Sequence, residues 1–303
     1  MTTPHGPRVS IGLPVYNGDR YITATLDSLL AQTHGDFELI ISDNASTDLT
    51  EEICRSYAER DNRILYFRNA ANRGSAANYR RVFELASGQY FRWANCDDLF
   101  APESLARCVE ILDGEPSVVL TYPKTKLIDK QGRVIDDYDD RLHIVSPKAS
   151  QRFVEVFERL GLVNAIYGLV RANVLRKTRL IRRFPGGDIP LVAELALYGK
   201  FWEIPEFLFY RRFHPGASSS YNERQLQEFY DPNTVGRPSL RSWKTLITNF
   251  GSMLRAPVGA REKLVIASYL LRGAVQVRSE LSEEVSTGMR YLRRTILSRP
   301  WLL

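Results

Sequence analysis

"VSIGLPVYNGDRYITATLDSLLAQTHGDFELIISDNASTD", residues 9–48, carries the pattern that decides the fold. The apolar run 9–13 predicts a strand, and Pro14 is expected to stop it because proline donates no hydrogen bond to a sheet. Residues 19–32 place apolar side chains at helical spacing, and the apolar run 37–41 predicts a second buried strand. A strand, an amphipathic helix and another strand in this order predict a parallel pair joined by a helical crossover.

The same alternation continues through residue 94, with a helix at 49–60 that Thr47 or Asp48 can cap, a strand at 63–69, a helix at 76–86 and a strand at 89–94. We therefore predict an α/β fold, a Rossmann-like and mostly parallel sheet flanked by helices on both faces. Further along, the sequence predicts a hairpin at Gln131 and Gly132, a helix at 151–161, a helix at 190–198 ended by Gly199, and two short strands separated by Pro205.

Composition bounds the class of protein. With 303 residues, the chain is long enough for one large domain, or for a domain with an appendage. No apolar run approaches the roughly 18 residues that a membrane-spanning helix needs, and residues 1–10 hold no apolar signal-peptide core, so we expect a cytoplasmic protein. Three cysteines without metal-ligand spacing predict neither disulfides nor zinc, and Cys54 and Cys108 are expected on the inner faces of helices.

Polar clusters follow each of the first four predicted strands. In open α/β sheets, ligands bind beyond the carboxyl ends of the strands, so we expect these clusters to form one binding edge. Asp97 and Asp98 come directly after the fourth strand. Two adjacent carboxylates suit a polar turn, but they also suit Mn²⁺ or Mg²⁺, which commonly shares its remaining positions with water and phosphate oxygens.

Two common nucleotide-binding patterns are absent from the sequence. No GxxxxGK[ST] segment occurs, which argues against a P-loop kinase or ATPase. The turn after the first strand, "LPVYNGDR", has no GxGxxG pattern, which argues against a Rossmann dehydrogenase.

The motifs taken together resemble those of the family-2 inverting glycosyltransferases of GT-A fold, of bacterial type. The similarity rests on "PVYN", "SDNASTD", "NRG" and "DD" in this order, and it covers roughly residues 8–215. It implies a GT-A catalytic domain at 1–220, with a nucleotide-sugar half at about 8–100 and an acceptor half at about 101–220. A basic, mainly helical C-terminal region would follow at 221–303.

The resemblance also implies roles for individual residues. The nucleotide-sugar site would comprise Pro14, Val15, Tyr16, Asn17, Asp43, Asn72, Arg73, Gly74, Asn78, Asp97 and Arg212. The divalent metal, Mn²⁺ or Mg²⁺, would be held by Asp97, Asp98 and His214.

Asp188 matches the family's general base, which takes a proton from the acceptor hydroxyl, and Glu194 is a second candidate for that role. Two positions depart from the family's pattern. Asn95 stands where many relatives have the first Asp of the metal motif, and Gly187 replaces a frequent Glu.

The implied activity is metal-dependent, inverting transfer of a hexose from a nucleoside diphosphate sugar, UDP- or dTDP-linked, to a hydroxyl of a glycan or lipid-linked acceptor. Two alternatives stay open. A nucleotidyltransferase also uses carboxylates and a metal, but it predicts a Gly-rich basic loop that "LPVYNGDR" does not supply. A catalytically inactive nucleotide-sugar-binding or scaffold protein of the same fold would bind nucleotide without turnover.

The C-terminal region is rich in Lys and Arg among apolar residues. Residues 263–278 place Leu264, Ala267, Leu271 and Ala274 along one helical stripe. Such a stripe is expected to pack on the catalytic domain or on a second copy in a homodimer, or else to lie on an anionic membrane surface as a peripheral anchor. Trp301 and the terminal leucines suit the membrane alternative. No recognised nucleic-acid-binding module is present, so nucleic acid is not an expected partner.

Overall fold

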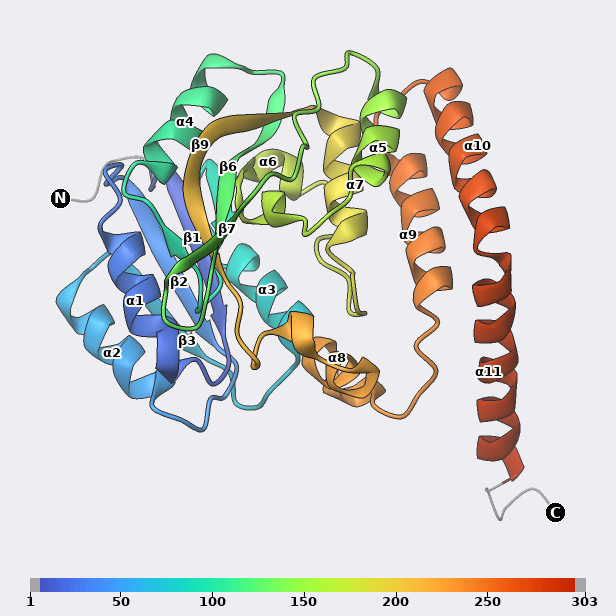
Figure 1. Ribbon diagram of the computed structural model, residues 1–303, viewed down its shortest axis with the longest axis horizontal. Helices are drawn as coiled ribbons and strands as arrows, with labels where there is room; N and C mark the ends of the chain where they lie inside the picture. The colour runs from blue at the N-terminus through green and yellow to red at the C-terminus, as the bar shows by residue number, and fades with distance from the viewer. Residues whose placement is uncertain (1–5, 298–303) are drawn as a thin grey trace.

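The computed structural model describes residues 6–297, so Trp301 and the chain ends at 1–5 and 298–303 lie outside the described residues. Within that range nine strands form one sheet in the order β3-β2-β1-β4-β8-β6-β9-β5, with β7 paired to β6 (Figure 1). The strands are β1 Val9–Val15, β2 Phe37–Asp43, β3 Ile64–Arg68, β4 Tyr90–Trp93, β5 Leu99–Phe100, β6 Val118–Ile128, β7 Val134–Tyr138, β8 Leu169–Arg171 and β9 Lys200–Arg212.

Helices cover both faces of this sheet. They are α1 Asp19–Leu30, α2 Thr50–Arg60, α3 Ser75–Glu84, α4 Ser104–Gly114, α5 Ala149–Glu158, α6 Ala172–Leu175, α7 Ile189–Tyr198, α8 Glu223–Tyr230, α9 Arg241–Arg255, α10 Ala260–Gln276 and α11 Arg278–Leu297. Short 3-10 turns occupy Asn164–Tyr167, Ser218–Ser220 and Pro232–Thr234. The predicted α/β class and the C-terminal helical extension are confirmed.

Strand pairing brings the carboxyl ends of the first four strands to one edge. β1 pairs in parallel with β2 and β4, and β2 pairs in parallel with β3. β8 is antiparallel to both β4 and β6, and β6 is parallel to β9. The mostly parallel sheet therefore has one reversed strand at its centre, which joins the two halves of the molecule.

The expected stop at Pro14 is wrong, because β1 continues to Val15. Val9 and Val15 make their hydrogen bonds to the β2 side, whereas Gly12 accepts from Ala94 at the end of β4. The backbone groups of a strand point alternately to its two neighbours, and Pro14 points to the same side as Gly12, toward β4. Because β4 has already ended at this level, the nitrogen of Pro14 faces no neighbouring strand. No ladder bond is lost there, and the strand tolerates proline.

The two short strands expected around Pro205 are a single strand, β9. Its register against β6 shifts after the Ile204–Pro123 pair, and the next pair is Phe207 with Lys124. Pro205 and Glu206 form the extra length on the β9 side, so a bulge absorbs the proline without ending the strand.

Two apolar cores lie on opposite faces of the sheet. One combines the alternate residues of β1 with the inner faces of α1, α2 and α4, and it contains the unpaired thiols of Cys54 and Cys108, as expected. The other joins α3, α5 and α7 to Met253 of α9 and to Ile266 and Leu270 of α10. The C-terminal helices therefore share a core with the sheet.

Of the alternatives for the stripe in α10, packing on the catalytic domain is wrong for its two leucines, whereas a second copy or a membrane surface stays a prediction. Leu264 and Leu271 are 69% and 58% exposed, and the packed face instead carries Ile266 and Leu270. Apolar residues occur around most of this helix, so their spacing did not identify the buried face. α10 and α11 run along the side of the molecule farthest from α1 and α2 (Figure 1). No helix among residues 6–297 is long and apolar enough to cross a membrane.

Candidate functional site

Asp43 ends β2 at the expected edge, and its side chain is fully buried. Its Oδ1 accepts a hydrogen bond from the Ser46 backbone at 2.8 Å. Its Oδ2 accepts from Tyr66 Oη at 2.8 Å and from Arg68 Nη1 at 2.6 Å. A nucleotide base reaching this carboxylate would therefore also meet Arg68, which ends the third strand and was not singled out from the sequence.

The segment after β1 is tied to the turn after β2. Asn17 has a positive φ of 51°, and its Oδ1 accepts from the Thr47 backbone at 2.8 Å. Its own backbone N–H donates to Ser46 Oγ at 2.9 Å. Pro14 and Val15 are buried in β1, whereas the Tyr16 side chain is 46% exposed. Among Pro14, Val15, Tyr16 and Asn17, the residue that presents an aromatic ring to solvent is Tyr16.

A set of asparagine amides holds the segment 72–74 against the same edge. Asn72 Oδ1 accepts from Asn44 Nδ2 at 2.8 Å and from the Gly74 backbone at 2.9 Å. Asn78 is buried and donates to the Ser42 carbonyl at 2.6 Å, so it supports the loop from beneath. Arg73 is exposed beside them, with its backbone N–H bound to Asn44 Oδ1 at 3.0 Å.

The two carboxylates after β4 have different environments. Asp98 is 1% exposed, and it accepts from the Arg212 backbone at 2.8 Å and from Asn95 Nδ2 at 3.0 Å. Burial, with the neighbouring charge of Asp97, raises the pKa of Asp98 to about 7. Asp97 is partly open to solvent, and its Oδ2 lies 2.9 Å from His214 Nε2.

Arg212, implied as a phosphate contact, is 6% exposed. Its Nε donates to the Asp97 carbonyl at 2.8 Å and its Nη1 to the Asp129 carbonyl at 3.1 Å. The guanidinium also lies 4.7 Å from the centre of the Tyr21 ring. These two hydrogen bonds hold the turn that carries Asp97 in place, and we call them the Arg212 clamp.

The donor set suits a divalent cation with few protein ligands. Asp97 and His214 converge and stay partly accessible, whereas both oxygens of Asp98 face other groups. Among residues 6–297, no group of three or more His, Cys, Asp or Glu side chains is arranged to hold a metal. Mg²⁺ and similar hard cations are often bound by one or two carboxylates together with water and substrate phosphates, and Asp97 could supply such a carboxylate beside His214.

Asp188 lies directly before α7, where burial raises the pKa of its carboxyl group. The positive charges of Arg211 and Arg241 act in the opposite direction. Glu194, the second candidate base, is 2% exposed and is ion-paired with Arg255 at 2.7 Å. Asp188 is therefore the better placed of the two for proton transfer.

Arg211 and Tyr167 both lie within electrostatic range of Asp98 and Asp188, and neither was singled out from the sequence. Arg211 Nη1 donates to the Leu162 carbonyl at 2.9 Å and to Asn164 Oδ1 at 2.6 Å. Its positive charge opposes the rise in the pKa values of Asp98 and Asp188 that burial causes. Tyr167 lies within electrostatic reach of the same two carboxyl groups. The only sequence signal was the position of Arg211 beside Arg212, shortly before His214.

Comparison with known proteins adds to this geometry. Residues 10–154 match the family described as Glycosyl transferase family 2. An uncharacterized glycosyltransferase of Rickettsia typhi is 28% identical over 236 residues, which span 74% of this chain and 70% of that relative.

Two solved structures share the fold. A fragment of TarS from S. aureus in complex with UDP-GlcNAc superposes with a TM-score of 0.62 at 19% identity, covering 88% of this chain and 73% of that one. A mannosyltransferase from Pyrobaculum calidifontis in complex with GDP-Man and Mn²⁺ superposes with a TM-score of 0.53 at 16% identity, covering 98% of this chain and 88% of that one. These similarities establish the GT-A fold of the chain.

The clamp formed by Arg212 generates a prediction about stability. Arg212→Met keeps the buried stem but removes hydrogen bonds to two carbonyls, so we expect the free energy of unfolding to fall by about 1–3 kcal/mol in urea denaturation. Arg133→Met is the matched control, since its side chain is 76% exposed and its ion pair with Asp129 lies at the surface. We expect this control to stay within about 0.5 kcal/mol of the parent. Equal losses in both variants would contradict the clamp.

Proposed function

We propose that the protein transfers a hexose from a nucleoside diphosphate sugar to a hydroxyl of a glycan or lipid-linked acceptor, because residues 10–154 match the family described as Glycosyl transferase family 2. The observation that carries this proposal is the contact of Asp97 with His214 at the polar edge of the sheet, together with Tyr167, which lies within electrostatic range of both Asp98 and Asp188. A UDP-sugar is the first donor to test, since the TarS fragment of the same fold binds UDP-GlcNAc. A dTDP-sugar is the second.

The proposed mechanism is inversion in one displacement. Asp188 takes the proton from the acceptor hydroxyl while that oxygen forms a bond to C1 of the donor sugar, and the bond from C1 to the diphosphate breaks. Asp97 and His214 would hold Mn²⁺ or Mg²⁺. Such an ion stabilises negative charge on a leaving diphosphate. Arg211 lies close enough to Asp188 to favour its ionised form.

Asp188→Asn tests the proposed base. We expect transfer to fall by a factor of about 10² or more, with the dissociation constant for UDP unchanged, because the amide keeps the shape but accepts no proton. Release of UDP from UDP-sugars in the presence of Mn²⁺ measures transfer, and calorimetry measures UDP binding. An unchanged rate would exclude Asp188. UDP binding without turnover in the parent protein would instead favour the inactive scaffold.

The buried environment of Asp188 predicts the acid limb of the pH profile. A general base can take up a proton only when it is deprotonated. We therefore expect kcat/KM to fall as the pH drops through the pKa of Asp188, which burial raises above the ordinary carboxyl value of about 4. Arg211→Met removes a charge that favours the carboxylate and should move this limb to higher pH, whereas Arg133→Met should leave it in place. If the residual kcat/KM of Asp188→Asn still falls at low pH, another titrating group causes that fall, and Asp98 is the first candidate.

The outer face of the C-terminal helices suits an anionic membrane surface, and we propose peripheral binding there. Leu264, Leu271 and Val275 of α10 and Met289 and Leu292 of α11 are each more than half exposed. Together, α10 and α11 contain seven Lys and Arg and four Glu. Like charges disfavour a homodimer through this face, whereas each basic residue near an anionic leaflet contributes about 1 kcal/mol.

Vesicle sedimentation tests the membrane proposal. We expect the full chain to bind phosphatidylglycerol-containing vesicles at least about tenfold more tightly than neutral ones, and salt should weaken the binding. Replacing both Leu271 and Leu292 by Ser should reduce the binding several-fold, whereas Leu65→Ser on β3, also exposed, should not. Equal binding to both vesicle types would refute the proposal. A dimer in light scattering that the double replacement dissociates would favour self-association.

A further inference from the structure

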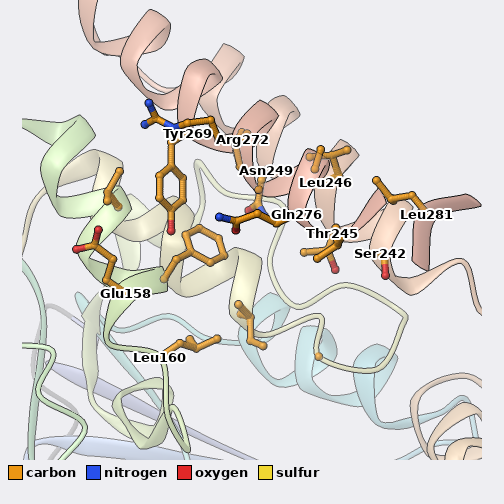
Figure 2. Close-up of a pocket in the computed structure, with 18 of the residues that line it drawn as sticks. Glu158, Leu160, Ser242, Thr245, Leu246, Asn249, Tyr269, Arg272, Gln276 and Leu281 are labelled. Atoms are coloured by element: carbon orange, nitrogen blue, oxygen red, sulfur yellow. The ribbon is translucent and has the colours of Figure 1, made fainter. Parts of the chain in front are cut away.

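A groove of about 1030 Å³ lies between α5, α9, α10 and the start of α11 (Figure 2). We propose that this groove binds a glycan, namely the sugar residues of an acceptor beyond the one whose hydroxyl receives the hexose. This assignment rests on the proposed glycosyl transfer and specifies its acceptor.

The inner end of the groove adjoins the proposed base. Gly186 and Ile189 form part of its wall, so the chain enters and leaves Asp188 beside the groove. Arg241, at the start of α9, lies over this end. A Cβ atom on Gly186 would be 2.8 Å from its Nη2, so glycine leaves room for the guanidinium. The charge of Arg241 also acts on Asp188. A chain of sugars in the groove would therefore lie beside the segment that carries Asp188.

A buried amide on the groove wall lacks a hydrogen-bond partner, which indicates that a ligand binds there. Asn249 is 2% exposed, and its Oδ1 has no hydrogen-bond partner within the described residues. Figure 2 shows this side chain at the groove, with Thr245 and Gln276 also on its walls. A buried carbonyl oxygen without a donor is costly, and a sugar hydroxyl is a donor that would satisfy it.

Aromatic rings and carboxylates complete a surface of mixed polarity. The rings of Tyr269 and Phe157 both line the groove, with their centres 6.1 Å apart. Sugar rings carry apolar C–H faces that pack on aromatic rings, and their hydroxyls donate to carboxylates such as Glu158 and Glu280 on the same walls.

A lipid chain or a lipid phosphate fits this groove less well. An apolar chain would cover Asn249, Gln276 and Glu158 without offering any of them a hydrogen bond. A phosphate would meet Arg241 and Arg272, but also the carboxylates of the groove. The charged side chains on its walls are Arg241, Arg272, Glu155, Glu158 and Glu280. The cations do not outnumber the carboxylates, so the groove does not select for an anion.

The experiment measures binding of the fluorescently labelled full chain to an array of defined microbial oligosaccharides and to vesicles containing a polyprenyl phosphate. We expect binding to at least one group of oligosaccharides. Asn249→Leu and Tyr269→Leu should each weaken it at least about tenfold, as expected for the loss of one buried hydrogen bond or one ring contact. Ile247→Ala, on the 64% exposed outer face of α9, should leave it unchanged.

Folding and activity are checked separately. Asn249→Leu removes an unsatisfied polar group, so its melting temperature without glycan should equal or exceed that of the parent, whereas a structural role would lower it. Asp188→Asn should retain glycan binding, which separates this proposal from the proposed transfer. Oligosaccharide binding that both groove variants retain would overturn the assignment. So would polyprenyl phosphate binding that both variants lose, or the absence of any oligosaccharide binding by a protein that still releases UDP from its donor.

Discussion

The hydrogen bond from the Arg212 backbone to Asp98 is the constraint on which the site depends. It joins the residue before β5 to the end of β9 across 114 residues of sequence, at 2.8 Å. This bond holds the end of β9, where His214 lies beside Asp97 and Arg211 lies within electrostatic range of Asp98 and Asp188. The carboxyl group is almost fully buried, and a lost partner would leave an uncompensated polar group in the interior. The link therefore positions the residues of the proposed metal and donor site.

Much of the first half of the fold was predictable, because each strand there is apolar and each is followed by an amphipathic helix. Errors arose where the effect of a residue depends on its neighbours. Pro14 and Pro205 were expected to end strands, yet one faces a side without a partner and the other lies in a bulge. In α10, apolar residues occur around most of the helix, and only its contacts with α5 and α9 determine that Ile266 and Leu270 are buried.

The candidate site, like the fold, could be predicted from the sequence only in part. The order of the motifs along the chain was enough to single out Asp97, Asp98, Asp188 and His214. Arg68, Tyr167 and Arg211 were missed because strands and turns rich in Arg and Tyr occur throughout this sequence. Their relevance follows from contacts between distant segments, which local spacing does not encode. The same holds for Arg212, whose guanidinium binds two backbone carbonyls. The groove along α9 and α10 likewise depends on how the C-terminal helices pack.

The most direct test of the proposed nucleotide-sugar and metal site is a calorimetric titration of the full chain with UDP, in Mn²⁺ and in EDTA. We expect UDP to bind at least about tenfold more tightly with the metal, and His214→Gln should remove most of that difference. Equal affinity in Mn²⁺ and EDTA would contradict the assignment of Asp97 and His214 to a metal. Failure of UDP, dTDP, GDP and CDP alike to bind would contradict the central claim that the polar edge of the sheet is a nucleotide-sugar site.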